Sequence, residues 1–558
     1  MIRSLFVLLF AAALCVPAAV RAEPAFSEQA NEMLSSVYPA DAPGAAVVVS
    51  RDGEVIYENA FGLADVELEV PLQPDHVFRL ASVTKQYAAA ALLKLVEEGR
   101  IELQDPLSKF LPDFPVRKVT IAQLLNHTSG IKSYTGIEGY MTSGRVRTDL
   151  TTEELVTVFA DEPVDFAPGE SWAYNNSGYV LIGAVIETVT EQPWNDYLRD
   201  TLLVPNGIVK TDAYPDFAIV PGRVEGYDGA AEAPQRAPFL SMTQPHAAGA
   251  LMATAGDVDR WQVALHRGEI LGDELYQRMI TPEGAAERAN YGYGIGVQDW
   301  FGLAALTHGG GIFGFQTYAL YLPAENLSVV ILANRAGPGW GARDLALRLA
   351  GLATGNSYPI EEESVEWSEA RLAQVQGTYR INDDEIRTIR FEDGELISQR
   401  NGGQEFDVYP ISGDRLAFET SLSAFLIERD AEGRVVAVAL QNPWGADPER
   451  AEKISDEVQT RQAVEVPVEQ LQRLEGRYEL QPGFVMTVRV DEGRLEVQAT
   501  GQPAIPMQAE SHVRFFSTEV GADIEFDLPA SGPATTLILY QGGQRMPALR
   551  IAEGSDTP

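Results

Sequence analysis

The feature that most constrains the fold is an internal repeat in the C-terminal third of the chain. Residues 372–379 (LAQVQGTY) align with residues 471–478 (LQRLEGRY), an offset of 99 positions. Self-similarity at a fixed spacing indicates one structural unit that occurs twice. Both copies contain short runs of alternating apolar and polar residues between glycine turns, which is typical of strands. We therefore predict two small antiparallel β-barrels, over residues 367–455 and 463–556.

The preceding part of the chain mixes helical and strand patterns. Residues 27–38 have the apolar spacing of a helix, and residues 44–57 predict a β-hairpin with an Asp-Gly turn. Residues 205–250 are rich in Pro, Gly and Ala and predict a long surface excursion. Further helices are expected at 82–98, 120–126, 151–159, 178–190, 254–266 and 342–353, a strand at 291–297, and a second hairpin whose strands are 315–322 and 327–333. This order favours an α+β domain with an antiparallel sheet.

The composition excludes several kinds of partner. A net charge of −38 argues against binding to nucleic acid or to anionic membrane surfaces. We attribute the acidic balance to an acid-biased proteome or a salty habitat rather than to a basic partner. A hydrophobic content of 45% with 22% charged residues is typical of a soluble globular protein.

The N-terminus has the features of a signal peptide. An apolar run at residues 5–20 follows a basic start, and the small-x-Ala pattern ending at Ala22 predicts cleavage there. The only cysteine, Cys15, lies in this segment, so the mature chain is expected to have no disulfide. No later apolar run reaches the roughly 18 residues of a membrane span. We therefore expect residues 1–22 to be removed and the protein to be exported, periplasmic or secreted, with no stable membrane anchor.

Ser82 and Lys85 begin the Ala/Leu-rich segment that ends at Gly99. Residues three positions apart share a face of a helix, which places a hydroxyl beside an amine. Serine is a weak nucleophile until a base takes its proton, and a lysine at a helix N-terminus experiences a positive field that disfavours its charged form. The alternative interpretation is a capping serine followed by a solvated lysine.

A second S-x-x-K, formed by Ser129 and Lys132, competes with the first as a nucleophile and base. Gly130 lies between them, and no helical apolar pattern continues after Lys132. Because a loop gives the two side chains no reason to face each other, we reject this pair.

Two further signals follow Ser82 and Lys85 in order. Tyr174 and Asn176 lie in a turn directly before a predicted helix, where polar side chains project into clefts. The alternative is a Tyr packed on a domain edge with an Asn capping the helix. His308 precedes three glycines in a predicted loop after a strand.

The ordered set Ser82-x-x-Lys85, Tyr174-x-Asn176 and His308-Gly-Gly resembles the serine β-lactamase and penicillin-binding-protein superfamily. The resemblance is closest to the class C-like branch with its DD-peptidases, D-aminopeptidases and esterases. It implies a β-lactamase/transpeptidase-like sheet flanked by helices with an all-α subregion, over residues 23–358. The two C-terminal repeats resemble the lipocalin-like tails of this branch.

The resemblance also implies a role for each motif residue. Ser82 would be the acylated nucleophile, Lys85 would take its proton, and Tyr174 would assist as base and then protonate the leaving group. His308 would hold the proton network or a substrate carboxylate. Substrate contacts are implied for Asn176, His308, Gly309 and Gly310, and oxyanion-hole N–H groups for Ser82 and Gly311.

One departure from the pattern narrows the expected activity. Class C β-lactamases have lysine where this chain has His308, and histidine is mostly neutral at pH 7. We therefore expect a D-amino-acid peptidase, amidase or esterase acting on a peptide, amide or ester, rather than an efficient β-lactamase. The alternative is a penicillin-binding or sensor protein of the same fold that does not turn over.

Two other hydrolase mechanisms fit the sequence poorly. An α/β-hydrolase needs G-x-S-x-G after its His-Gly-Gly loop, and the nearest candidate, residues 169–173, comes before the loop and lacks the last glycine. The six histidines never pair as H-x-x-x-H, so we expect no metal or other cofactor. The repeats are interpreted as a stabilising appendage; covering the active site, binding an apolar ligand or forming a homo-oligomer are alternatives.

Overall fold

The computed structural model describes residues 24–551 with internal gaps. The positions outside the description are 1–23, 117, 138, 232, 301–302, 338, 340, 356–363, 383–384, 393, 402, 404, 412, 420, 443–447, 459–463, 482–483, 492, 500–503, 518–521, 542–543 and 552–558. The predicted signal peptide and Cys15 therefore lie outside the described residues. In the part of the chain that is described, every helix is too short or too polar to cross a bilayer.

The N-terminal domain is built on one six-stranded antiparallel sheet, in the order β2-β1-β12-β11-β10-β9. Ala45 pairs with Ala333, so the first hairpin and the last strands of the domain close the same sheet. The two predicted hairpins are confirmed. The strands are β1 (Ala45–Arg51), β2 (Glu54–Phe61), β9 (Gly296–Trp300), β10 (Leu303–Ile312), β11 (Phe315–Leu322) and β12 (Leu327–Ala333).

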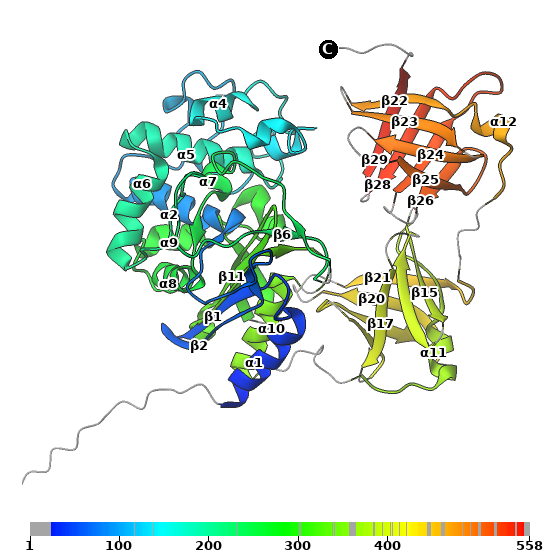
Figure 1. Ribbon diagram of the computed structural model, residues 1–558, viewed down its shortest axis with the longest axis horizontal. Helices are drawn as coiled ribbons and strands as arrows, with labels where there is room; N and C mark the ends of the chain where they lie inside the picture. Colours follow the sequence, from blue (N-terminus) through cyan, green and yellow to red (C-terminus); the bar gives the residue numbers. More distant parts are fainter. Residues whose placement is uncertain are drawn as a thin grey trace, which may run out of the picture.

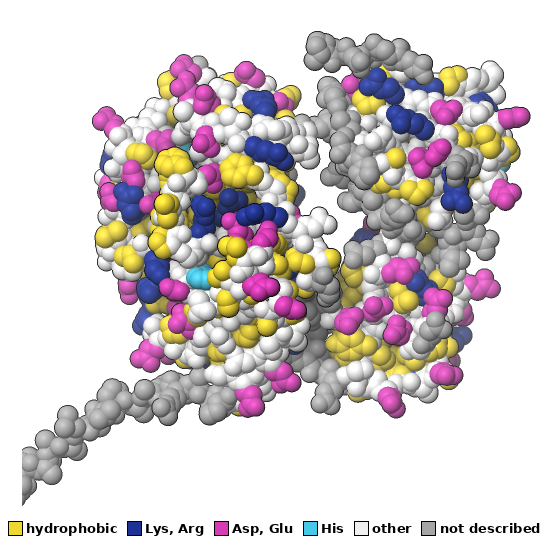
Figure 2. Space-filling view, viewed as in Figure 1, with side chains coloured by type: hydrophobic (Ala, Val, Ile, Leu, Met, Phe, Trp, Pro, Cys, Tyr) yellow, Lys and Arg dark blue, Asp and Glu magenta, His cyan; other side chains and the backbone are white. Residues whose placement is uncertain are grey.

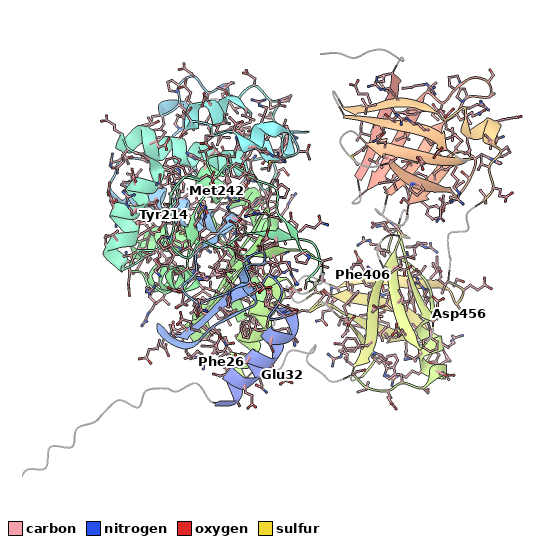
Figure 3. All side chains as sticks on the ribbon, in the orientation of Figure 1. Phe26, Glu32, Tyr214, Met242, Phe406 and Asp456 are labelled. Carbon is pink, nitrogen blue, oxygen red and sulfur yellow. The ribbon has the colours of Figure 1, made fainter. Side chains whose placement is uncertain are left out.

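Helices cover both faces of this sheet (Figure 1). On β1, Val47 and Val49 face one helical layer while Ala46 and Val48 face the other, because successive side chains of a strand point to opposite faces. The first layer is α1 (Pro24–Val37) and α10 (Ala342–Thr354); the second includes α2 (Thr84–Glu97), α5 (Asn176–Thr190) and α8 (Ala255–His266). Figure 3 labels Phe26 near the start of α1, a helix of the first layer.

An all-helical subregion extends the second layer. Thr120 and Thr151 each form a capping box at the helix start that the sequence predicts, and Thr254 caps α8. The helical elements of this subregion are α3 (Ile121–Leu125), α4 (Thr152–Thr157), α6 (Trp194–Leu198), a π-helical turn at Arg199–Leu203, α7 (His246–Gly249) and α9 (Asp273–Met279).

The repeats form two closed eight-stranded antiparallel barrels, as predicted (Figure 1). Barrel 1 comprises β14 (Gly377–Arg380), β15 (Ile386–Glu392), β16 (Glu395–Arg400), β17 (Glu405–Ile411), β18 (Arg415–Phe418), β19 (Ala424–Arg429), β20 (Val435–Gln441) and β21 (Glu449–Ser455). Barrel 2 comprises β22 (Gly476–Gln481), β23 (Phe484–Asp491), β24 (Arg494–Ala499), β25 (Ala504–Ala509), β26 (Arg514–Ser517), β27 (Ala522–Asp527), β28 (Thr536–Gln541) and β29 (Gln544–Ile551). Each is preceded by a short helix, α11 (Glu369–Val375) or α12 (Val468–Leu471).

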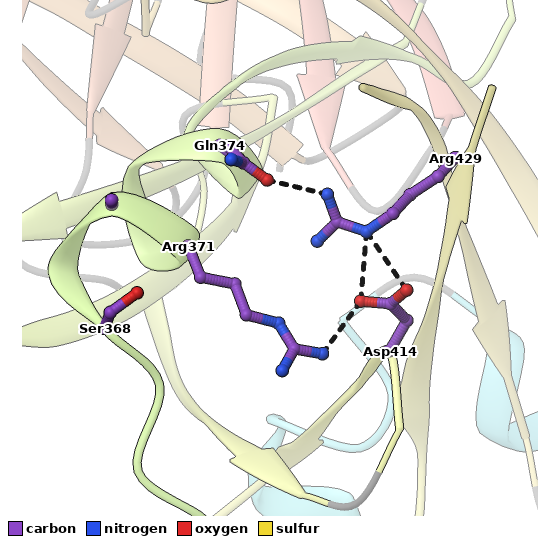
Figure 4. A pocket seen from close by; sticks show the side chains of 6 residues that line it. Ser368, Arg371, Gln374, Asp414 and Arg429 are labelled. Carbon is purple, nitrogen blue, oxygen red and sulfur yellow. Dashed lines mark hydrogen bonds and ion pairs between the residues drawn. The ribbon is translucent and has the colours of Figure 1, made fainter. Parts of the chain in front are cut away.

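The offset of the repeat holds at the level of single contacts. The hydroxyls of Tyr379 and Tyr478 each donate to the carbonyl four residues earlier, on Val375 and Leu474. Both barrel interiors are lined by buried apolar side chains. In barrel 1, Arg371 of α11 and Arg429 of β19 both bind Asp414 and so fasten the helix to the barrel mouth (Figure 4).

Barrel 1 packs against the first helical layer of the N-terminal domain. Ile411, Ala417 and Leu422 belong to the same apolar cluster as Leu345 and Leu349 of α10. This contact lies on the face of the sheet opposite α2, the helix that contains Lys85. It favours the stabilising role for barrel 1 over a cover for the active site. Acidic side chains are spread over the domain and both barrels (Figure 2), as the net charge predicts.

Three local predictions are wrong. The strand predicted at 291–297 begins only at Gly296, because the Tyr-Gly repeat before it forms a turn. The glycine loop predicted at 308–311 is part of β10 and pairs with β11. The excursion at 205–250 is not confined to the surface, because its last residues enter the core at α7.

Short strands tie this segment to the start of α2. β5 (Phe78–Arg79) pairs with β8 (Met252–Ala253), and Leu80 N–H donates to Leu251 C=O at 2.8 Å. Residues 246–253 are therefore held beside the turn that contains Ser82. The remaining short strands are β3 (Leu63–Asp65), β4 (Val70–Pro71), β6 (Tyr227–Asp228), β7 (Gln235–Arg236) and β13 (Arg335–Ala336).

Candidate active site

Ser82 lies in a 3₁₀ turn, Ala81–Val83, that leads directly into α2. The alternative interpretation of Ser82 as a helix cap is wrong: Val83 occupies the cap position of α2, and no side chain caps the helix. Ala81 has a positive φ of 49°, a left-handed conformation that costs free energy for a residue with a Cβ. The turn that contains Ser82 is therefore sharp and strained, and the Ser82 hydroxyl takes no part in capping α2.

The Lys85 amine is the centre of the polar contacts. Its Nζ lies 3.1 Å from Ser82 Oγ, 2.8 Å from Asn176 Oδ1 and 2.8 Å from the carbonyl oxygen of Ala248. The last two atoms only accept hydrogen bonds, so they take two N–H groups of the amine. In a neutral amine, the remaining lone pair faces Ser82 Oγ.

The surroundings of Lys85 favour that neutral form. The side chain is fully buried, and within the described residues it forms no ion pair. Burial holds the pKa of the Lys85 amine well below its ordinary value, because a charged ammonium loses its hydration there. Lys85 therefore has the geometry and the basicity of a proton acceptor for Ser82.

Tyr174 borders the same hydroxyl. Lys85 Nζ lies 4.7 Å from the centre of the Tyr174 ring, and the residue as a whole keeps 38% of its surface exposed. Desolvation of the phenol raises the pKa of Tyr174, and the neighbouring Ser82 hydroxyl opposes that rise. The phenol therefore keeps its proton at neutral pH, beside the oxygen of Ser82.

Asn176 is held in place by residues that the sequence did not single out. Asn175, not Asn176, caps α5 by accepting from Gly178 N–H at 2.8 Å. Asn176 Nδ2 donates to Thr135 Oγ1 at 2.9 Å, which turns its Oδ1 towards Lys85. The amide can therefore bind Lys85 and still lie at the first turn of α5.

His308 sits in β10 with both ring nitrogens occupied. Nδ1 lies 2.7 Å from Gly309 O, an atom that only accepts, so Nδ1 carries the proton. Nε2 lies 2.8 Å from the Tyr291 hydroxyl, which therefore donates to it. Burial, with the nearby Lys85 amine, lowers the pKa of His308 to about 3. The ring is neutral at pH 7.

The glycines after His308 allow a close approach between β10 and the Ser82 turn. β9 pairs with β10 only as far as Thr307, so the later residues of β10 have a free edge on that side. A Cβ on Gly310 would lie 2.2 Å from Leu80 O and 2.2 Å from Thr317 Oγ1. At Gly311, no atom of the described residues lies within 4 Å of such a position. The strand therefore needs glycine at 310 to lie against the turn.

We expect Gly310→Ala to lower turnover of an ester substrate by about 10²-fold, because the new methyl group must push β10 away from Ser82. The measurement is kcat/KM together with the melting temperature. Gly144→Ala is the matched control, since Gly144 has open space around its Cβ position. An unchanged kcat/KM in Gly310→Ala would mean that the strand position is not critical.

The rejected pair Ser129 and Lys132 is separated in the structure. Ser129 is buried and its Oγ accepts from Ile131 N–H at 3.3 Å. Lys132 Nζ points instead to Asp165 Oδ1, 3.0 Å away. The two side chains thus have different partners.

Sequence reasoning missed four positions that shape the site. Tyr291 and Thr135 fix the orientation of His308 and Asn176, and the Ala248 carbonyl binds Lys85. His127 is buried against the Tyr174 ring, with ring centres 4.5 Å apart, and its Nδ1 accepts from Asn175 N–H. His127 lies in the segment 125–131, which the family resemblance also covers; the other three positions depend on contacts between distant segments.

Comparison with known proteins gives two family matches. The family described as "Beta-lactamase" matches residues 35–354, and "Domain of unknown function (DUF3471)" matches residues 460–550. "Penicillin-binding protein 4*" of Bacillus subtilis (strain 168) is 23% identical over 394 residues, 66% of this chain and 86% of that protein. "D-aminopeptidase" of Gluconobacter oxydans (strain 621H) is 26% identical over 362 residues, 63% of this chain and 65% of that protein.

Solved structures agree in fold. An octameric penicillin-binding protein homologue from Pyrococcus abyssi has a TM-score of 0.54 at 22% identity, covering 77% of this chain and 99% of its own. D-amino acid amidase from Ochrobactrum anthropi SV3 in complex with D-phenylalanine has a TM-score of 0.52 at 22% identity, covering 60% of this chain and 100% of its own.

Proposed function

The chain belongs to the β-lactamase family, and from this premise we propose that it is a serine hydrolase that forms an acyl-Ser82 intermediate. The main support is the buried Lys85 amine, whose N–H groups are taken by Asn176 and Ala248 while its lone pair faces Ser82 Oγ. We further propose that the protein is exported, on the strength of the signal-peptide pattern at residues 1–22.

Acylation follows from these positions. Lys85 Nζ takes the Ser82 proton while Oγ forms a bond to the substrate carbonyl carbon. The N–H groups of Ser82 and Gly311 hold the oxyanion, since the free edge of β10 lies beside the 3₁₀ turn. The scissile bond then breaks, and the Tyr174 hydroxyl gives its proton to the leaving amine or alcohol. Tyr174 recovers this proton from the Lys85 ammonium.

Deacylation reverses the proton path. A water molecule attacks the acyl carbon while the neutral Lys85 amine takes its proton, either directly or through the Tyr174 hydroxyl, which passes its own proton on to Lys85. The bond between the acyl carbon and Ser82 Oγ then breaks, and the Lys85 ammonium returns the proton to Ser82 Oγ. The free acid and the resting serine result. Asn176 stays in contact with Lys85 throughout, and we propose that it also binds the substrate amide.

The substrate class that we favour is a D-amino-acid peptide or amide, or an ester. The relatives named D-aminopeptidase and D-amino acid amidase support this preference. Neutral His308 supports it too, because a positively charged lysine would be the better partner for the carboxylate of a β-lactam.

The test is covalent labelling of the mature protein. It is incubated with a nitrophenyl ester and with a fluorescent penicillin, and the adduct is mapped by mass spectrometry. We expect released nitrophenol over many turnovers and an adduct on the peptide that contains Ser82. An adduct on another residue would refute the proposed nucleophile, and a stable adduct without turnover would indicate the non-hydrolytic alternative.

We expect Tyr174→Phe to slow acylation by about 10²-fold or more, because general acid–base catalysis by one group contributes on this order. The initial rate of nitroaniline release from a D-amino-acid nitroanilide measures this step, because an amine must gain a proton as it leaves, whereas nitrophenolate leaves without one. A rate close to wild type would exclude Tyr174 as the proton donor.

Two further statements stay predictions: self-association through the barrels, and the domain boundaries 23–358, 367–455 and 463–556. Light scattering of the mature chain measures its self-association. An octamer is known for the Pyrococcus abyssi homologue, and we propose a homo-oligomer here on that basis.

A further inference from the structure

We propose that Tyr291 is a positioning residue that locks His308 as a neutral Nδ1–H tautomer, and that this makes the enzyme select substrates without a carboxylate next to the scissile bond. The inference rests on the proposed function, because it concerns which substrates reach Ser82. It starts from two hydrogen bonds that leave the His308 ring no free donor.

His308 has no hydrogen-bond donor to offer a substrate. Gly309 O takes the Nδ1 proton at 2.7 Å, and the Tyr291 hydroxyl donates to Nε2 at 2.8 Å. A substrate carboxylate needs a hydrogen-bond donor or a positive charge. His308 in this state supplies neither, so it does not act as the carboxylate contact that the family resemblance implied.

The groups around the His308 ring favour its neutral form as well. Among the described residues, the titratable side chains that face His308 are Lys85, His127, Tyr174 and Tyr291. No carboxylate belongs to this set, so nothing in it stabilises a protonated imidazole. His127 Nδ1 accepts a hydrogen bond from Asn175 N–H, and burial lowers the pKa of His127, so this ring is neutral as well. The groups around His308 therefore also favour its neutral form.

Tyr291 is held in place by backbone pairing and by packing. It follows the 3₁₀ turn Gly284–Ala289 and bridges to Gly296, the first residue of β9. Its ring lies 4.8 Å from the His127 ring, and the residue is buried. Burial raises the pKa of the Tyr291 hydroxyl well above its ordinary value, so it remains a donor across the working pH range.

The experiment combines nuclear magnetic resonance with a matched pair of dipeptides. Wild type, Tyr291→Phe and His308→Lys are compared with the control Tyr293→Phe. This control changes the tyrosine two positions after Tyr291 and removes a hydroxyl that donates to Glu283. The dipeptides are D-Phe-D-Ala with a free C-terminal carboxylate and the same dipeptide amidated. Both are measured as substrates and as competitive inhibitors of nitrophenyl ester turnover, so that the preference is obtained even where neither is cleaved.

We expect wild type and Tyr293→Phe to prefer the amidated dipeptide by about 10-fold or more. The preference should shrink in Tyr291→Phe and reverse in His308→Lys, which adds a cation. Imidazole ¹⁵N shifts should report the Nδ1–H tautomer of His308 in wild type, and its pKa should rise by about one unit in Tyr291→Phe, because the lost bond favoured the neutral ring.

Equal preference for the two dipeptides in wild type would overturn the inference, as would an unchanged tautomer and pKa in Tyr291→Phe. These failures leave labelling of Ser82 intact. A protein that shows the expected His308 tautomer but never acylates Ser82 would instead refute the proposed function. Melting curves of each variant confirm that the protein is folded.

Discussion

Lys85→Met is expected to lower kcat/KM on a nitrophenyl ester by about 10³- to 10⁴-fold, because it removes the proposed base while nearly keeping the volume of the side chain. The residual reaction would come from Ser82 and the oxyanion hole alone. The variant also leaves Asn176 Oδ1 and Ala248 O without their donor, so some loss of stability should accompany the loss of rate.

The pH profile distinguishes a base from a structural lysine. Burial disfavours the charged form, so the pKa of Lys85 is lowered, and the amine becomes protonated only as the pH falls through that lowered value. Wild-type kcat/KM should therefore fall on the acidic side of this pKa and level off above it. The acidic limb should vanish in Lys85→Met.

Lys132→Met is the control for the same chemical change. Lys132 belongs to the second S-x-x-K and forms an ion pair with Asp165 at 3.0 Å on the surface. Exposed pairs of this kind contribute up to about 1 kcal/mol, so turnover should stay within about twofold of wild type. An equal loss in both variants would contradict the assignment of Lys85 as the base.

Ser82→Ala is expected to reduce ester turnover by about 10⁴-fold or more and to abolish labelling by a fluorescent penicillin. The hydroxyl is the only atom group removed, and it caps no helix, so the melting temperature should change little. Intact-mass measurement after incubation with either probe detects any remaining adduct.

Ser129→Ala is the matched control, because Ser129 is the serine of the rejected motif. Its hydroxyl accepts from Ile131 N–H, so its loss should cost about 1 kcal/mol of stability but leave labelling of Ser82 unchanged. Labelling that disappears in Ser129→Ala and persists in Ser82→Ala would exchange the roles of the two serines.

The structure agrees with the sequence where the local pattern is strong. The capping boxes at Thr120 and Thr151 and the hairpin that follows Ala45 lie where their residues predict them. These features depend on side chains and backbone within a few positions of each other. The 99-residue offset likewise predicts two barrels, because equal sequences repeat equal turns and strand lengths.

The candidate site shows the limit of local patterns. Ser82 with Lys85 and Ser129 with Lys132 both have the spacing S-x-x-K, and only the apolar helical pattern that follows Lys85 distinguishes them in the sequence. Their difference lies in distant partners: Asn176 and Ala248 bind one lysine, and Asp165 binds the other. Ala248 belongs to the segment that composition predicted to be a surface excursion, and only its pairing beside Leu80 brings it inside.

The sequence by itself therefore determined the architecture and the residue types of a serine-based site. The tertiary structure alone decided the charge state and orientation of these residues. A lysine becomes a base only when burial removes its hydration, and His308 becomes a neutral ring only when Gly309 and Tyr291 occupy its nitrogens. Both effects arise from contacts between segments far apart in the chain, which no short pattern encodes.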